Sequence, residues 1–267
     1  MVDNAPDRRP VAGIAATHGA RYVLEPVIGL SRARNAGLRA ATGEVVAFVD
    51  DDAVPHPAWV PCLAELFRDP DIGAVGGEIV PLTTDPDPGA YRIAERRRVR
   101  RADSHWFEIA SFGGVGNGGN MSFRRNALLR VGGFDERLGL GSTVPGFEDH
   151  DAFMRVVEAG YTAVSDPDVI VSHDARGRDS QQRVTAQYAS ALPYLVFLFM
   201  ERPAHRHRVV RYALEAITGK RREWRLQSET LPLTRRQRFI AALSAPRLTW
   251  RALVQSLSST DSATLLP

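Results

Sequence analysis

The sequence has one cysteine, Cys62, among its 267 residues, so no disulfide can form within the chain. A disulfide framework is therefore excluded, and a reducing compartment suits the protein. Lysine is equally scarce, with Lys220 alone, so arginine supplies nearly all the positive charge. No internal repeats occur. The glycine-rich stretch at 113–119 does not follow a predicted strand, as the glycines of a dinucleotide-binding fingerprint do, and no P-loop lysine follows it. Dinucleotide binding and P-loop chemistry are therefore both disfavoured.

Long hydrophobic segments are also absent. Residues 1–10 are polar and lack the apolar core of a signal peptide. The longest apolar run, at 189–200, contains Pro193 and is shorter than the roughly 20 residues needed to cross a bilayer. We therefore expect a cytoplasmic protein that does not span a membrane, with peripheral contact at the inner face of the cell membrane as a further expectation.

The net charge of +3 is unevenly distributed along the chain. Residues 201–255 contain 13 Lys and Arg against 4 Asp and Glu, whereas the rest of the chain is acidic. A basic tail favours contact with an anionic membrane surface or a lipid phosphate, and a solvated helical surface is the alternative interpretation. The tail has no aromatic residues interleaved with its basic ones, so a nucleic-acid partner is not expected.

Strand and helix patterns alternate over the first two thirds of the sequence. Residues 31–41 are predicted to form a helix, with Ser31 as a candidate N-cap. The apolar run that follows at 44–49 is typical of a strand covered on both faces. This alternation predicts an α/β fold, with a Rossmann-like, mostly parallel sheet and flanking helices. The other expected strands are 21–24, 72–82, 161–164 and 169–171, and the other expected helices are 58–67, 124–131 and 148–159. Residues 83–101 are expected to form a mobile loop.

Three consecutive carboxylates, Asp50, Asp51 and Asp52, follow the strand predicted at 44–49. Ligands of α/β sheets bind outside the carboxyl ends of strands, and adjacent carboxylates repel one another unless a cation neutralises them. The run therefore indicates an Mg²⁺ or Mn²⁺ site. A polar turn, favoured by Pro55 and Pro57, is the alternative.

Further polar residues come later in the chain. Glu148 and Asp149 begin a predicted helix, whose N-terminus favours ionised carboxylates, as a base requires. His173 follows a predicted strand and is a candidate third ligand for the metal, although a lone histidine is also common in structural roles. The glycines of 113–119 allow close approach of a sugar to the backbone, or simply form a turn.

The order of these motifs resembles that of the bacterial family 2 glycosyltransferases, which adopt the GT-A fold. VDN near the start is followed by the Gly29–Gly37 run, by FVDDD at 48–52 and by GNGGNMSFRR at 116–125. GGFDERLG, FEDHD, AGY and VSH then follow between 132 and 173. The resemblance covers residues 2 to about 177. It implies a GT-A domain over 1–177 and a helical, basic C-terminal extension over 178–267.

The resemblance also implies roles for matching residues. Asp149, with Glu148 beside it, matches the catalytic base, and Asp52, with His173, matches the metal ligands. The nucleotide-sugar site would include Asp3, Arg34, Asn35, Asp50 and Asp51. The sugar and acceptor pocket would be shaped by Asn117, Gly118, Gly119 and Asn120.

The resemblance thus implies an inverting, metal-dependent transfer from a nucleoside-diphosphate sugar to a hydroxyl acceptor. The expected acceptor is a glycan or lipid-linked molecule of cell-envelope or polysaccharide biosynthesis. Two other functions stay open: a degenerate GT-A domain that binds anionic membranes through its basic helical tail, with an interfacial helix around 194–200, and a nucleotidyltransferase.

One departure from the family concerns the start of the sequence. Relatives have a hydrophobic strand and a helix before the VDN element, and that strand is central in the GT-A sheet. Here Met1 directly precedes VDN. We therefore expect a chain beginning at Met1 to be unstable or weakly active, because its sheet would lack an inner strand.

Overall fold

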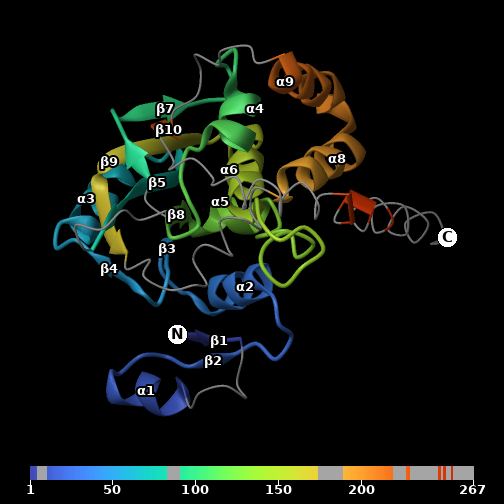
Figure 1. Cartoon of the computed structure of the whole chain (residues 1–267). Helices are drawn as coiled ribbons and strands as arrows, with labels where there is room; N and C mark the ends of the chain where they lie inside the picture. Colours follow the sequence, from blue (N-terminus) through green and yellow to red (C-terminus); the bar gives the residue numbers. More distant parts are fainter. Residues whose placement is uncertain are drawn as a thin grey trace.

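The computed structural model describes residues 1–4, 11–82, 91–173, 189–218, 227–228, 246–247, 249–250 and 254. Its centre is a six-stranded sheet with helices on both faces (Figure 1). The strands follow the order β3-β8-β5-β9-β4, and β7 also pairs with β9. Their bounds are β3 Val45–Val49, β4 Ala53–Pro55, β5 Ile72–Pro81, β7 Arg97–Val99, β8 Asn120–Arg124 and β9 Thr162–His173.

The sheet is mixed, and most of its pairs are antiparallel. β5 and β9 run parallel, whereas β3 and β5 are antiparallel to β8, and β4 and β7 are antiparallel to β9. The predicted α/β architecture with flanking helices is confirmed, but the prediction of a mostly parallel sheet is wrong. Apolar runs such as β5 report burial on both faces, and burial does not fix the direction of the neighbouring strand.

Strand β3 also differs from its expected environment. Among the described residues it pairs with β8 alone, so it lies at an edge of the sheet. Ala47 and Val49 are exposed, with Val49 at 41%. The expectation that this strand is covered on both faces is therefore wrong for these two residues.

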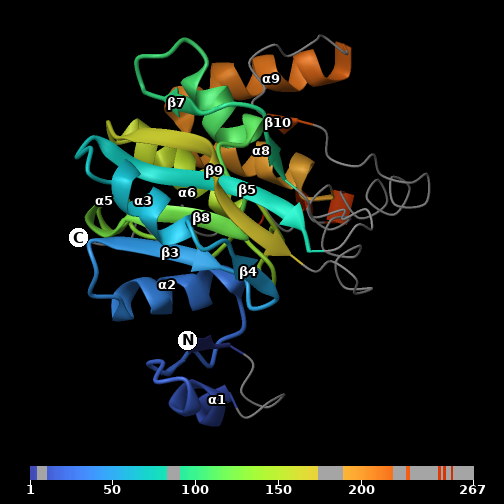
Figure 2. The same ribbon diagram turned by 90° about the vertical axis from the view of Figure 1, so that its left-hand side faces the viewer.

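Helices cover the two faces of the sheet unequally (Figure 2). The larger hydrophobic core contains Phe107, Phe123, Phe153 and Tyr194, and the smaller one packs Trp59 and other residues of α3 against β5 and β9. The helices are α2 Leu30–Ala40, α3 Trp59–Leu66, α4 Trp106–Glu108 with a π-helix at Ile109–Gly113, α5 Arg125–Arg130, α6 Glu148–Glu158, α8 Ala191–Glu201, a 3₁₀ turn at Pro203–His205, and α9 Arg206–Thr218.

Most predicted elements agree with the structure to within two or three residues, and the exceptions are informative. The two strands expected at 161–164 and 169–171 are one strand, β9, with a register shift opposite Gly77 and Glu78. Ser31 lies inside α2 and does not cap it, because Gly29 occupies the N-cap position. Residues 83–90 of the expected loop lie outside the described residues, and the rest contains two short strands, β6 (Arg92–Ile93) and β7.

The N-terminal segment forms a small unit of its own. β1 (Val2–Asp3) and β2 (Val23–Leu24) pair in parallel on either side of α1 (Val11–Thr17) in sequence, as a two-stranded sheet separate from the central one. This unit lies beside α2 (Figures 1 and 2). Val2 contacts the helix where Gly37 leaves space, since a Cβ on Gly37 would lie 3.2 Å from the Val2 side chain.

The C-terminal helices are integrated into the main core. Tyr194, Phe197 and Leu198 of α8 and Val209 of α9 are buried in the larger hydrophobic cluster. The stretch 194–200, interpreted above as an interfacial helix, is therefore mainly a core-packing segment. Within the described part of the chain, no helix is both long and apolar enough to cross a membrane. Most of the basic tail beyond 218 lies outside the described residues.

Candidate functional site

Two aspartates and a histidine meet where β3, β4 and β9 come together. Asp50 and Asp52 lie in the turn between β3 and β4, and β4 places Ala53 opposite His173 at the end of β9. One potential ligand atom from each of Asp50, Asp52 and His173 lies within 4.8 Å of the others. Nε2 of His173 is 3.2 Å from Oδ1 of Asp52. Two carboxylates and an imidazole form a donor set that fits Mn²⁺ or a similar divalent ion.

The three consecutive aspartates are not equivalent. Asp50 and Asp52 are half-buried and belong to the group with His173, whereas Asp51 is exposed and does not. The sequence prediction that Asp52 and His173 lie close enough to share a metal thus agrees with the geometry. The structure adds Asp50, which was assigned from the sequence to the nucleotide instead.

The second acidic pair begins helix α6. Glu148 and Asp149 are each 5% exposed. Nη1 of Arg34 donates to Oε1 of Glu148 at 2.5 Å, and the Gly118 N–H donates to Oδ2 of Asp149 at 2.8 Å. The Nδ1 of His150 is 2.9 Å from the other oxygen, Oδ1, of Asp149. Both carboxylates are therefore held in fixed directions before any substrate is considered.

These contacts move the two pKa values apart. Burial, together with the adjacent charge of Asp149, raises the pKa of Glu148 despite Arg34. Burial also acts to raise the pKa of Asp149, but the charge and hydrogen bonds of His150, with help from Arg34, lower that pKa to about 2. Asp149 is consequently ionised at neutral pH, as an acceptor of protons must be.

A glycine-rich loop lies between the two acidic groups. A Cβ on Gly118 would lie 2.6 Å from the Arg34 guanidinium, and one on Gly119 would lie 3.1 Å from Oδ2 of Asp50. The glycines at these positions thus leave room for Arg34 on one side and Asp50 on the other. The loop is also the element that connects the Asp50 group to Asp149, through the Gly118 N–H.

The asparagines at the two ends of this loop have different environments. Asn117 is half-buried and accepts the Gly119 N–H at 3.1 Å. Asn120 is fully buried, accepts from the indole N–H of Trp59 at 2.9 Å and donates to the carbonyls of Glu78 and Val169. Its side chain therefore connects strands inside the core, and the pocket role given to Asn120 by the resemblance stays a prediction.

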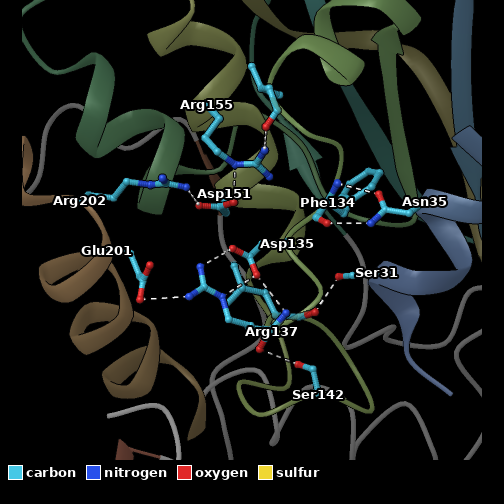
Figure 3. Close-up of polar contacts among 12 residues, drawn as sticks. Ser31, Asn35, Phe134, Asp135, Arg137, Ser142, Asp151, Arg155, Glu201 and Arg202 are labelled. Carbon is cyan, nitrogen blue, oxygen red and sulfur yellow. Dashed lines mark hydrogen bonds and ion pairs between the residues drawn. The ribbon is translucent and has the colours of Figure 1, made fainter. Parts of the chain in front are cut away.

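Helix α2 uses its polar side chains to connect separate loops. Arg34 reaches Glu148 and the Gly118 carbonyl, the latter at 3.0 Å. The Asn35 amide makes reciprocal hydrogen bonds of 2.8 Å with the backbone of Phe134 (Figure 3). Ser31 donates to the Leu138 carbonyl at 2.6 Å. These hydrogen bonds hold the groups that build the site, and the prediction that Arg34 and Asn35 line the nucleotide pocket stays a prediction.

Asp3 lies apart from this assembly, on β1. It is buried and accepts a hydrogen bond of 3.0 Å from the Tyr22 hydroxyl. That contact raises the pKa of Tyr22 after a larger effect of burial. The base-contacting role given to Asp3 by the resemblance stays a prediction.

Several residues that support the site were not predicted as functional from the sequence. Asp151, two residues after Asp149, is fully buried between Arg155 and Arg202, at 2.6 and 3.3 Å (Figure 3). Phe147 directly precedes the acidic pair and has a left-handed backbone, with φ of 66°. The spacing of Asp151 and Arg155 at i and i+4 was a usable signal. The contact of Arg202 was not, because 51 residues separate it from Asp151.

Comparisons with known proteins show what the chain is similar to. The family model described as "Glycosyl transferase family 2" matches residues 1–132. A glucosyl-dolichyl phosphate glucuronosyltransferase of Haloferax volcanii is 34% identical over 42% of this chain, and a pre-mycofactocin glycosyltransferase of Mycobacterium tuberculosis is 33% identical over 63%. The aligned parts span only 36% and 35% of these relatives' own lengths.

A solved structure shows the likeness of the fold. The crystal structure of S. aureus TarS superposes with a TM-score of 0.53 and 14% identity, over 83% of this chain and 38% of that one. The architecture with a central sheet and flanking helices is thus of the GT-A type expected from the sequence.

Proposed function

We propose that this chain is a glycosyl transferase of family 2, whose model matches residues 1–132, and that it transfers a sugar from a nucleoside-diphosphate sugar to a hydroxyl acceptor, with inversion at the anomeric carbon. The observation that carries the proposal is the position of the glycine loop between two acidic groups of different chemistry. Asp50, Asp52 and His173 form a donor set for a metal, and Asp149 is a fixed, ionised carboxylate.

The two groups would divide the reaction between them. Asp50, Asp52 and His173 would hold Mn²⁺ or Mg²⁺, which when bound supplies positive charge to stabilise the leaving diphosphate. Asp149 accepts the proton of the acceptor hydroxyl. At the same time the hydroxyl oxygen of the acceptor bonds to the anomeric carbon, and the bond between that carbon and the diphosphate oxygen breaks. Arg34 and the Gly118 N–H hold Glu148 and Asp149 in place.

The acceptor and the place of action are further parts of this proposal. One relative is named for transfer to a glucosyl-dolichyl phosphate, which supports testing polyprenyl-phosphate-linked sugars alongside free glycans. A role in cell-envelope or polysaccharide synthesis at the inner face of the membrane fits such an acceptor. Asp3 and Asp51 are proposed to contact the nucleotide, and Asn117 the sugar or acceptor.

The test is a panel of UDP- and GDP-sugars with Mn²⁺ or Mg²⁺, assayed for released nucleoside diphosphate and for the anomeric configuration of the product. We expect Asp52→Asn and His173→Ala to lower turnover by about 10- to 100-fold or more, as removal of metal-supporting groups does. Asp71→Asn is the matched control, because Asp71 is exposed at the opposite end of β5. Release of pyrophosphate would indicate a nucleotidyltransferase instead, and metal-independent turnover would contradict the metal site.

A further inference from the structure

The backbone directly before the acidic pair has an unusual conformation. Phe147 has a φ of 66° and a ψ of 8°. Among the described residues, every other residue with a positive φ is a glycine. A left-handed conformation brings the Cβ of an L-residue close to its carbonyl oxygen and persists when the surroundings enforce it. Whatever holds Phe147 in this conformation therefore also sets the direction in which α6 begins, and with it the direction of Asp149.

Two rings contact Phe147: that of His150, with centroids 5.3 Å apart, and that of Tyr194 on the C-terminal helix α8. The rings of Phe147 and Tyr194 are stacked, with centroids 4.5 Å apart and planes at 12°. Tyr194 is fully buried, and Phe112 and Phe197 pack around its ring at 6.0 and 6.2 Å. Tyr194 thus presents a rigid surface to Phe147, because it has no space in which to turn away.

A second contact ties α8 to the same turn of α6. Arg202, just after the end of α8, pairs with the buried Asp151 at 3.3 Å (Figure 3). Helix α8 therefore holds the start of α6 on both sides of the acidic pair, at Phe147 and at Asp151. This helix lies beyond residue 132, outside the part matched by the family model.

The ring of Tyr194, and not its hydroxyl, makes the contact. The hydroxyl is buried and has no hydrogen-bond partner in the described structure. Burial, followed by the charges of Asp151 and Asp149, raises the pKa of Tyr194, so the hydroxyl is neutral at physiological pH. A phenylalanine at this position would keep the stacking surface and remove only the unpaired group.

We propose that Tyr194 and Phe147 form a positioning pair, which fixes the backbone before Glu148 so that Asp149 points at the acceptor hydroxyl. The inference rests on the proposed function, in which Asp149 is the base. Helix α8 would thus take part in the transfer step, although it lies far from the acidic pair in the sequence.

The first test compares three α8 variants of the full chain. For Tyr194→Leu we expect kcat to fall by about 10- to 100-fold with little change in KM for the nucleotide sugar, since small misplacements of a reacting group have effects of this size. Tyr194→Phe should keep wild-type kcat. Leu198→Ala is the matched control, because Leu198 is equally buried on α8 but is not part of the ring stack. Equal losses in Leu198→Ala, or in Tyr194→Phe, would overturn the proposal.

The second test asks whether the effect acts through Asp149. In an Asp149→Asn background, Tyr194→Leu should lower the residual turnover no further. Phe147→Leu combined with Tyr194→Leu should lose no more than either change alone. An independent, multiplicative loss in either combination would contradict a positioning role.

A third measurement does not depend on turnover. Hydrogen exchange of the amides of residues 148–151 should be faster in Tyr194→Leu than in Leu198→Ala, because the start of α6 loses its support. Equal exchange in these two variants would overturn the proposal even if no substrate is found. By contrast, absence of turnover by the wild type with every nucleotide sugar would refute the proposed function and leave the exchange result standing.

Discussion

Asp149 combines almost complete burial with a charge that its neighbours stabilise. Its folded-state pKa is lowered to about 2, so its contribution to stability is present above the unfolded value near 3.9 and is lost as the pH falls towards 2. Glu148 behaves in the opposite way, since its raised pKa makes its ionised form the unfavourable one in the folded state. Two adjacent carboxylates thus have opposite effects on the pH dependence of stability.

The first prediction follows from this difference. Between pH 4 and pH 2, the free energy of unfolding of the wild type should fall by about 2 kcal/mol more than that of Asp149→Asn. Urea denaturation across this pH range measures the difference. At neutral pH the same substitution should lower turnover by about 10²- to 10⁴-fold, more than Glu148→Gln does. Parallel pH curves for the two proteins would show that Asp149 is not the group stabilised by His150.

The second prediction concerns Asn35. Asn35→Ala leaves the buried N–H and carbonyl of Phe134 without partners, and should lower the free energy of unfolding by about 3 kcal/mol. Arg32→Ala is the control one turn away, because its ion pair with Glu136 is exposed and should be worth less than about 1 kcal/mol. Thermal and urea denaturation compare the two. A loss in Asn35→Ala no larger than that of the control would show that the Phe134 turn finds other partners.

At the scale of elements, β5 and the glycine loop approach each other closely. A Cβ on Gly76 would lie 2.3 Å from the Gly116 Cα and from the Val115 carbonyl oxygen. Both obstacles are backbone, so they cannot turn aside as a side chain does. The contact presses the loop onto the sheet and thereby places Gly118 and Gly119 beside Arg34 and Asp50.

The third prediction tests this contact with a pair of Gly→Ala changes. Gly76→Ala should destabilise the protein by more than about 3 kcal/mol, since overpacking costs typically reach that size even where side chains can move. Gly13→Ala should be neutral or stabilise by up to about 1 kcal/mol, because Gly13 lies in exposed helix α1 with no atom within 4 Å of the added carbon. Melting temperatures of both variants provide the measurement. A mild effect at Gly76 would mean that the loop can lift from the sheet.

At this scale the sequence predicted much of the structure. The helices at 30–40 and 148–158 were recognisable with the help of the glycines that follow them, the helix at 59–66 from its apolar spacing and the Asp-Pro-Asp after it, and β3 and β5 from their apolar runs. Strand β8 was not recognised, because its residues Asn120–Arg124 lack a long apolar run and were considered only as a motif. Strand direction was also beyond reach, since it depends on partners distant in sequence.

For the candidate site, the structure tests which predicted residues lie close together but not the roles predicted for them. Asp52 and His173 were matched as metal ligands through the family resemblance, and the structure brings their side chains together. The role of Arg34 and Asn35 in lining the nucleotide pocket stays a prediction, and their described hydrogen bonds, which hold Glu148, Gly118 and the Phe134 turn, could not be foreseen from the sequence. A motif shows which residues matter, but polar side chains can serve by binding a ligand or by holding its site.

Across the whole molecule, the C-terminal helices close the main core. Besides the apolar residues of α8 and α9, the buried carboxylate of Glu108 pairs with Arg208 at 2.8 Å and with Arg211. The catalytic domain was expected to end at residue 177, but residues of α8 and α9 beyond that point fill the core and pair with its buried carboxylate. The two-part division of 1–177 and 178–267 stays a prediction about folding units.

The fourth prediction tests that division. A chain ending at residue 177 should lose cooperative unfolding and bind a hydrophobic dye, since it exposes the surface under Tyr194 and Phe197 and leaves Glu108 buried without its cations. Breaking a buried ion pair alone costs about 3–5 kcal/mol. Circular-dichroism melting and dye fluorescence give the readout. A sharp transition like that of the full chain would instead establish 1–177 as an independent unit.

The meeting of Gly76 and Gly116 has a consequence for how this chain can change over generations. Elsewhere in a core, a bulkier residue on one side can be offset by a smaller one opposite. Here the opposing residue is already the smallest available, so neither position can compensate for a change in the other. Paired saturation mutagenesis should find glycine retained at both positions in nearly every active clone, because backbone atoms alone exclude any larger residue there.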